Sequence, residues 1–371
     1  RGHHIHILTR KLPSHKKDKE TIQGVTECRY DCNQHNAAFF LKGTFRNAKR
    51  LFESLNQHYK FECINFHQPF SALGVTHSSC SNSISKIYTC HSLSFEEFSS
   101  RNGKASDLIK KTSNFLQILA RKKIEKNGLI KSDAIVVLSK FTKKKLVDIY
   151  NISNGKIWII PGGVNLNIFK PADDKTAIRK KLNIPQEKVV LFTVRNLVWR
   201  MGIENLIIAF KEIIKKSKEF YLVIGGKGPL EDGLIALTRS LDIEGQVQFT
   251  GFIGVDDLPL YYQMADLFIL PTRELEGFGL VTLEAMACGL PVLGTPIGGT
   301  KEILGKFDPQ FLFDDIHPDS ITKLILEKYK AIKENPQQWR KISEQCRQFV
   351  EAQYSWERNV DALEDLFLSS I

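Results

Sequence analysis

The chain has 371 residues, of which 42% are hydrophobic and 25% are charged, as expected for a soluble globular protein of about two domains. No apolar run approaches the roughly 20 residues that a membrane-spanning helix requires, so none is predicted. The seven cysteines are odd in number and scattered, which favours reduced thiols in a cytoplasmic setting over a disulfide framework.

The net charge of +11 is unevenly distributed along the chain. Residues 1–170 contain 28 Lys and Arg against 12 Asp and Glu, whereas the remainder contains 24 against 29. A basic front half and a mildly acidic rear half indicate two domains that face different partners. Because no aromatic platform or known module accompanies the charge, nucleic-acid binding is not predicted.

In the front half, short apolar runs predict four strands, at 5–8, 61–65, 86–89 and 134–138. The basic excess peaks between Lys104 and Lys145, where apolar residues at helical spacing lie beside six basic ones. Two interpretations stay open for this segment. Its face rests on anionic lipid or grips a charged glycan, or its apolar stripe packs on the protein's own sheet. The apolar residues are Leu108, Ile109, Phe115, Leu116 and Leu119, and the basic ones are Lys110, Lys111, Arg121, Lys122, Lys123 and Lys126.

In the rear half, strand-like and helix-like segments alternate, which is typical of doubly wound α/β domains with parallel sheets. The predicted strands are 189–194, 220–224, 246–249, 267–270 and 292–293, and the predicted helices include 204–216, 230–240, 258–264 and 356–368. A linker is predicted in the Pro-, Asn- and Asp-rich run at 165–176. The resulting domains are 1–168 and 169–354, with 355–371 as a last helix.

The most specific motif is EGFGLVTLEAMACGLPV, from Glu276 to Val292. Gly277 and Gly279 let the backbone approach a ligand closely, and the pattern becomes helical from about Leu280. A glycine turn that opens a helix presents free N–H groups and the positive end of the helix dipole, which together suit a phosphate. Glu276 before the turn and Glu284 within the helix can each accept hydrogen bonds from ligand hydroxyls. Phosphate between two hydroxyl-binding carboxylates describes a nucleotide sugar.

This stretch resembles the donor-site signature of family 4 of the retaining glycosyltransferases. Further segments resemble the family in its order, among them SDAIVVLSKFTKKKL, KIWIIPGGVNLNIFKP, VIGGKGPL, YYQMADLFILPT and PIGGTKEIL. The resemblance implies the GT-B architecture, in which two Rossmann-like domains with doubly wound parallel sheets flank a cleft. It also implies sugar transfer from a nucleotide donor with retention at the anomeric carbon, no catalytic metal, and a last helix that crosses back onto the first domain.

The family's usual phosphate-binding Arg and Lys correspond here to Asn196 and Met201, neither of which carries a charge. Arg195 and Arg200 each lie one position earlier, so Arg200 is the first candidate for the diphosphate clamp and Arg195 the second. The resemblance further implies that Glu276 binds the sugar, Glu284 the ribose, and the backbone of Gly277, Phe278, Gly279 and Leu280 the diphosphate. Phe252 and Ile253 would offer backbone groups to the base, and Gly226 would line the donor cleft.

His91 follows a predicted strand, at the carboxyl end where α/β sheets keep their ligands. In the family a histidine at this place contacts the donor sugar, so His91 and Glu276 are the candidate catalytic residues.

The first ten residues resemble the family's second strand. The first strand, the glycine loop and the first helix are therefore expected to be missing, as in a fragment of a longer protein.

The leading hypothesis is a retaining, metal-independent transferase. Its donor would be a UDP-, GDP- or ADP-sugar, and its acceptor a polysaccharide, lipid-linked or surface glycan. It would need no cofactor and would act in the cytoplasm, with peripheral contact between the basic front domain and an anionic membrane. The alternative is a non-catalytic nucleotide-sugar-binding pseudo-transferase or partner subunit, which the substitutions at Asn196 and Met201 and the missing loop favour.

Overall fold

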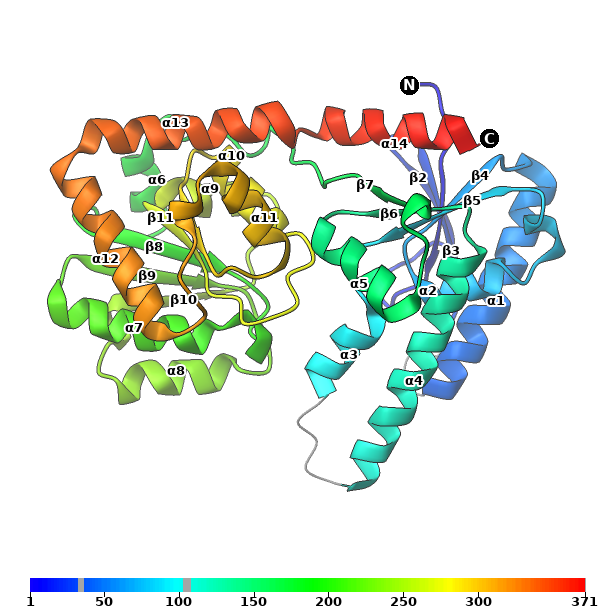
Figure 1. Ribbon diagram of the computed structural model, residues 1–371, viewed down its shortest axis with the longest axis horizontal. Coiled ribbons are helices and arrows are strands. Elements are labelled where there is room, and N and C mark those ends of the chain that lie inside the picture. Colours follow the sequence, from blue (N-terminus) through cyan, green and yellow to red (C-terminus); the bar gives the residue numbers. More distant parts are fainter. Residues whose placement is uncertain (33–36, 103–107, 371) are drawn as a thin grey trace. The chain divides into compact units, whose positions relative to one another are not determined.

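The computed structural model describes residues 1–32, 37–102 and 108–370, and it has an α/β fold that divides into two compact units (Figure 1). Unit 1 comprises Arg1–Val137, Lys143–Ile159 and Glu364–Ile371, and unit 2 comprises Leu138–Thr142 and Ile160–Leu363. The division between the units falls after Ile159, and the last helix, α14 (Trp356–Ser370), has residues in both. The domain boundary after residue 168 stays a prediction.

Unit 1 contains a parallel sheet with the order β4-β5-β6-β7 and a separate sheet with the order β1-β3-β2. In the second sheet β1 is parallel to β3 and β2 is antiparallel to it. The four predicted strands are confirmed as β1 (His6–Arg10), β4 (Cys63–Phe66), β5 (Ser85–Cys90) and β6 (Ala134–Val137). Three strands were not predicted, namely β2 (Lys19–Ile22), β3 (Val25–Tyr30) and β7 (Ile157–Ile159). The helices are α1 (Ala37–Tyr59), α2 (Pro69–Val75), α3 (Ser94–Asn102), α4 (Leu108–Lys131) and α5 (Lys140–Tyr150).

Helix α4 carries the first part of the predicted basic segment and α5 its last lysines, whereas Lys104 lies outside the described residues. The exposure of α4 tests the two interpretations of this segment. Its outer apolar residues do not pack on the sheet, because Phe115, Leu116 and Leu119 are 59%, 60% and 47% exposed. The interpretation that the stripe packs on the protein's own sheet is therefore wrong for these three side chains.

Unit 2 is built around a parallel sheet with the order β10-β9-β8-β11-β12. Its strands are apolar and buried, as the pattern predicted, because helices cover both faces of the sheet. Helices α7 and α8 lie on one side, and α9, α10 and α13 lie on the other (Figure 1). The strands are β8 (Val189–Val194), β9 (Phe220–Gly225), β10 (Val247–Gly251), β11 (Leu267–Leu270) and β12 (Val292–Gly294).

The helices of unit 2 begin and end where local sequence signals favour it. Helix α7 follows Gly202, which has φ of 71°, and its buried residues recur at helical spacing. Helices α12 and α13 begin with a proline in the first turn. The helices are α6 (Lys175–Lys181), α7 (Ile203–Lys216), α8 (Glu231–Ser240), α9 (Leu258–Met264), α10 (Leu280–Ala287), α11 (Gly298–Phe307), α12 (Pro318–Glu334) and α13 (Pro336–Gln353). Among the described residues, no helix combines the length and the apolar character that crossing a bilayer requires.

Candidate functional site

The strand order of unit 2 locates a candidate site. From β8 the chain adds β9 and β10 on one side, then returns to place β11 on the other side of β8. Open α/β sheets bind ligands at the carboxyl ends of the strands where the order reverses in this way. That point lies between β8, which is followed by Arg195, and β11, which is followed by the loop that leads to Glu276.

Arg195 and Glu276 form a buried ion pair at this reversal point. Nη2 of Arg195 donates to Oε2 of Glu276, and the two side chains are 7% and 9% exposed. Thr272 Oγ1 donates to the same carboxylate oxygen at 3.2 Å, and Met201 Sδ lies 3.1 Å from Nε of Arg195. The sequence placed Arg195 and Glu276 in one site but gave no sign of their pairing. Met201, which stands where the family usually has a charged residue, packs its sulfur against the guanidinium of Arg195.

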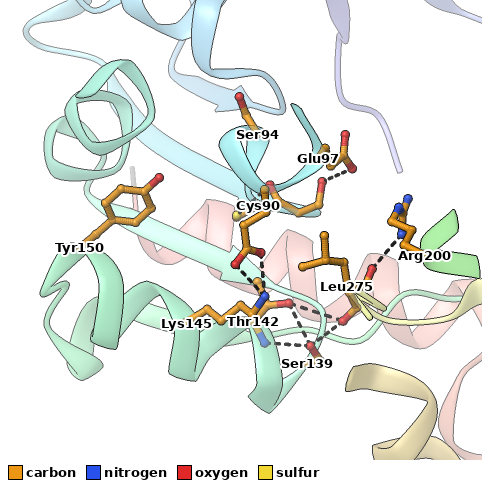
Figure 2. A network of polar contacts seen from close by, with 12 residues as sticks. Cys90, Ser94, Glu97, Ser139, Thr142, Lys145, Tyr150, Arg200 and Leu275 are labelled. Carbon is orange, nitrogen blue, oxygen red and sulfur yellow. Dashed lines mark hydrogen bonds and ion pairs between the residues drawn. The ribbon is translucent and has the colours of Figure 1, made fainter. Parts of the chain in front are cut away.

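Arg200, the first candidate for the diphosphate clamp, braces the loop before Glu276. Its Nη1 donates to the carbonyl oxygen of Leu275 at 3.0 Å (Figure 2). Leu275 has φ of 60°, a left-handed conformation that costs a non-glycine residue roughly 1 kcal/mol or more and that often occurs at functional sites. Asn196 is exposed beside this loop. Contact of either residue with a donor stays a prediction.

Helix α11 packs tightly against the loop that carries Glu276. Gly299 N donates to the carbonyl oxygen of Glu276 at 3.0 Å, and a Cβ atom on Gly298 would lie 1.8 Å from the same oxygen. Only glycine therefore fits at position 298. Ser139 Oγ donates to the carbonyl oxygen of Gly277 at 2.7 Å, with Thr142 Oγ1 at 3.4 Å (Figure 2). Together these contacts fix the backbone on both sides of Glu276 and Phe278.

The first turn of α10 has the features of an anion site. Gly279, with φ of 88°, precedes it, and the N–H groups at a helix start have no partner within the helix. The hydroxyl groups of Thr282 and Thr300 are buried, and neither has a hydrogen-bond partner among the described residues. A Cβ atom on Gly279 would lie 2.8 Å from Thr300 Oγ1 and 3.2 Å from Thr282 Oγ1. Glycine at position 279 thus leaves room for these two buried hydroxyls beside the helix start.

Glu284 is held by a hydrogen bond from a buried side chain. Tyr262, which is fully buried, donates its hydroxyl to one carboxylate oxygen of Glu284 at 2.8 Å. Burial raises the pKa of Glu284, and the bond from Tyr262 opposes that rise. Among the described residues no other side chain hydrogen-bonds this carboxylate. Contact of Glu284 with a ribose stays a prediction.

Three other predicted donor residues follow β9 and β10. Gly226 has φ of 112°, and a Cβ atom there would lie 1.8 Å from the carbonyl oxygen of Arg195, so the two strand ends touch. Ile253 packs against Gly225, whereas Phe252 is 74% exposed. The proposed contact of this pair with a base stays a prediction.

In unit 1, His91 follows β5 and pairs with His67, which follows the neighbouring strand β4. Nδ1 of His67 lies 2.9 Å from Nε2 of His91, and the rings stack with centroids 5.2 Å apart. Sequence reasoning missed His67, although its place after a strand was the signal that identified His91. Burial lowers the pKa of both rings, with Glu97 opposing the shift at His91. Because both residues keep exposed surface, water screens part of this effect.

The loop after His91 is anchored to a buried carboxylate. Glu125 on α4 is 1% exposed and accepts hydrogen bonds from Ser94 N at 2.9 Å and from the Tyr150 hydroxyl at 2.5 Å. Burial raises the pKa of Glu125 to about 7. Lys145 forms a further ion pair with Glu96 at 2.6 Å.

Unit 2 thus brings together Arg195, Arg200, Glu276, the start of α10 and Glu284, and unit 1 holds His91. Within the described residues, no group of three His, Cys, Asp or Glu side chains could hold a metal ion.

Solved structures share this fold. Sucrose-phosphate synthase from Thermosynechococcus elongatus superimposes with a TM-score of 0.81 at 22% identity, over 99% of this chain and 89% of that one. HepE from Anabaena, solved with UDP and glucose, gives 0.72 at 17% identity, over 93% and 86%. These likenesses establish the GT-B fold.

Sequence relatives point the same way. A GDP-mannose-dependent alpha-(1-6)-phosphatidylinositol monomannoside mannosyltransferase of Mycobacterium tuberculosis is 27% identical over 245 residues, which is 63% of this chain and 61% of that protein. The chain therefore spans less than two thirds of this relative. Residues 1–168 match the family described as Glycosyltransferase Family 4, and residues 174–354 match Glycosyl transferases group 1. With both domains matched in this order, the chain belongs to the family 4 glycosyltransferases.

Proposed function

We propose that the chain is a retaining glycosyltransferase that moves a sugar from a nucleotide donor to a polysaccharide, lipid-linked or surface-glycan acceptor. The observation that carries the proposal is the site at the reversal point of unit 2, where Arg195 after β8 pairs with Glu276 on the loop that opens α10. The helix start and Arg200 would bind the diphosphate, Glu284 the ribose and Glu276 the sugar hydroxyls. The family relationship supports this assignment.

In the reaction, charge develops on the departing diphosphate and on the sugar ring. N–H groups at the start of α10 and the guanidinium of Arg200 would stabilise the phosphate oxygens without a metal. Glu276 would contact the sugar as it acquires oxocarbenium character, and the family resemblance gives His91 the same role. No covalent role is assigned to His91.

The test uses UDP-, GDP- and ADP-sugars with chelator present, and it follows release of free nucleoside diphosphate. We expect turnover with one nucleotide, and a product whose anomeric configuration by NMR matches that of the donor. Glu276→Gln should lower turnover about 100-fold, which corresponds to about 2.7 kcal/mol of lost transition-state stabilisation.

Glu274→Gln is the matched control, because Glu274 is exposed and lies two positions from Glu276. Its turnover should equal that of the unaltered chain. Tight donor binding without turnover by the unaltered chain, with or without acceptors, would instead support a nucleotide-sugar-binding protein.

We further propose that the chain acts in the cytoplasm and contacts an anionic membrane through α4. The outer face of that helix combines the exposed Phe115, Leu116 and Leu119 with exposed Lys123 and Lys126. The one acidic residue of α4, Glu125, is buried on the opposite side. A helix with apolar and basic residues on one exposed face suits the headgroup region of an anionic bilayer.

A further inference from the structure

The two histidines of unit 1 continue a pattern of polar pairs across strands β4 and β5. Thr89 Oγ1 donates to Asn65 Oδ1 at 2.9 Å, and two residues further along each strand His91 meets His67, also at 2.9 Å. Both pairs join residues 24 positions apart. The register of the two strands pairs residues 22 positions apart, such as Asn65 with Ile87, so both side-chain contacts run diagonally across the ladder. His67 directly follows β4 and His91 directly follows β5, so the ends of two neighbouring parallel strands bring the two rings together.

The backbone around His91 is held on the other side as well. After His91, Ser92 Oγ donates to Glu97 at 2.6 Å, and Ser94 N donates to the buried Glu125 at 2.9 Å. With the strand before it and these bonds after it, the main chain at His91 has little freedom. The remaining freedom is rotation of the imidazole about its two side-chain torsions.

The contact with His67 restricts that rotation and couples the proton positions of the two rings. The rings are nearly parallel, at 18°, and one nitrogen of each faces the other. Between two neutral imidazoles, one nitrogen must donate and the other accept. If Nε2 of His91 accepts, its Nδ1 carries the proton; if Nε2 donates, Nδ1 is a bare acceptor. Either way, Nδ1 is the nitrogen of His91 that stays available to a ligand.

We propose that His67 is a positioning residue for His91, which it holds in one ring orientation and one tautomer so that Nδ1 faces the donor sugar in a single protonation state. This inference rests on the proposed function, in which His91 contacts that sugar. A single tautomer matters because a hydrogen bond with a sugar hydroxyl requires that Nδ1 of His91 be either a defined donor or a defined acceptor.

Two substitutions separate the hydrogen bond from the ring stacking. His67→Phe keeps a flat ring of similar size but has no nitrogen, whereas His67→Asn places a polar atom near the position of Nδ1. We expect His67→Phe to lower kcat about tenfold, which equals about 1.4 kcal/mol and is the size of one hydrogen bond, with the donor KM changed less than about twofold. His67→Asn should retain most of kcat.

The matched control is His77→Phe, which alters another exposed histidine of unit 1 that also contacts an aromatic ring, that of Phe45. Its kcat should be unchanged. The proposal is overturned if His67→Phe keeps kcat within about twofold of the unaltered chain, or if His67→Asn is as impaired as His67→Phe.

A second measurement does not need turnover. Imidazole nitrogen shifts from ¹⁵N NMR should show His91 as a single tautomer in the unaltered chain and as a tautomer mixture in His67→Phe. A mixture already present in the unaltered chain overturns the proposal. If no donor is consumed but His91 holds one tautomer, the proposed function fails while the positioning role of His67 stands.

Discussion

Glu125 shows how one buried carboxylate makes unit 1 sensitive to pH. Burial raises its pKa to about 7, while the bonds from Ser94 N and the Tyr150 hydroxyl oppose that rise. In the unfolded chain the pKa returns to about 4.5. The folded state therefore binds this proton more tightly, so its stabilising effect is present at low pH and is lost as pH rises from about 4.5 through about 7.

Replacing Glu125 by Gln should remove this dependence. Between pH 5 and pH 8, the free energy of unfolding of Glu125→Gln should rise relative to that of the unaltered chain by on the order of 2 kcal/mol. Urea unfolding at both pH values measures the difference. Glu62→Gln, on an exposed residue of the same unit, should give no such change. An equal offset at the two pH values for Glu125→Gln would contradict the raised pKa.

At the residue scale, the sequence predicted those site residues that belong to one local motif. Glu276, Gly279 and Glu284 could be assigned because their chemistry depends on a glycine turn followed by a helix. The ion pair of Arg195 with Glu276 joins residues 81 positions apart, and the pair of His67 with His91 joins residues 24 apart. Such contacts depend on strand order, which local patterns do not contain.

At the scale of elements, the strands of the large parallel sheet were predicted well and the hairpin of β2 and β3 was not. Strands β8 and β11 and helix α9 have the predicted bounds, because their apolar runs reflect burial on both faces of a sheet or on one face of a helix. The hairpin of β2 and β3 turns at Gln23 and Gly24, which have φ of 52° and 82°. Strand β2, KETI, has only one large apolar residue, so no alternation marks it.

Helix α4 gives a prediction for membrane contact. The chain should sediment with vesicles that contain anionic lipid, and much less with zwitterionic vesicles, because both the apolar and the basic residues of the outer face contribute. Changing Phe115, Leu116 and Leu119 together to Ser should abolish sedimentation, and Lys123→Gln with Lys126→Gln should weaken it about 30-fold, at about 1 kcal/mol per lysine.

The control for the α4 variants changes another exposed apolar residue of unit 1, Ile22→Ser, which should leave binding intact. Light scattering in the absence of lipid measures the mass of the protein. It therefore tests whether a second copy of the chain, instead of a membrane, covers this face. A dimer that the triple Ser variant converts to a monomer, without vesicle binding by the unaltered chain, would assign the face to a second copy.

At the scale of the whole molecule, the residues proposed to bind the nucleotide all belong to unit 2. A nucleoside diphosphate alone should therefore slow hydrogen exchange in α10 and in the 195–202 loop, and leave the amides of β4 to β7 unchanged. At a concentration 100 times its Kd, the ligand should stabilise the protected elements by about 2.7 kcal/mol.

The control ligand for this hydrogen-exchange experiment is the corresponding nucleoside monophosphate. Without its second phosphate it should protect the loop after β10 more than the first turn of α10. Protection confined to unit 1 would contradict the assignment of the nucleotide site.

The ion pair between Arg195 and Glu276 also bears on which molecules can enter the site and leave it. Parting a buried pair leaves two uncompensated charges, at a cost of several kcal/mol. A ligand that parts the two side chains must therefore supply a partner for each of them. A free sugar can offer only neutral hydroxyls, and inorganic phosphate can offer only an anion. In the proposed reaction, an intact nucleotide sugar would offer hydroxyls to Glu276 and phosphate oxygens to Arg195, the second candidate for the diphosphate contact. After the sugar has left, re-formation of the pair would favour release of the nucleotide.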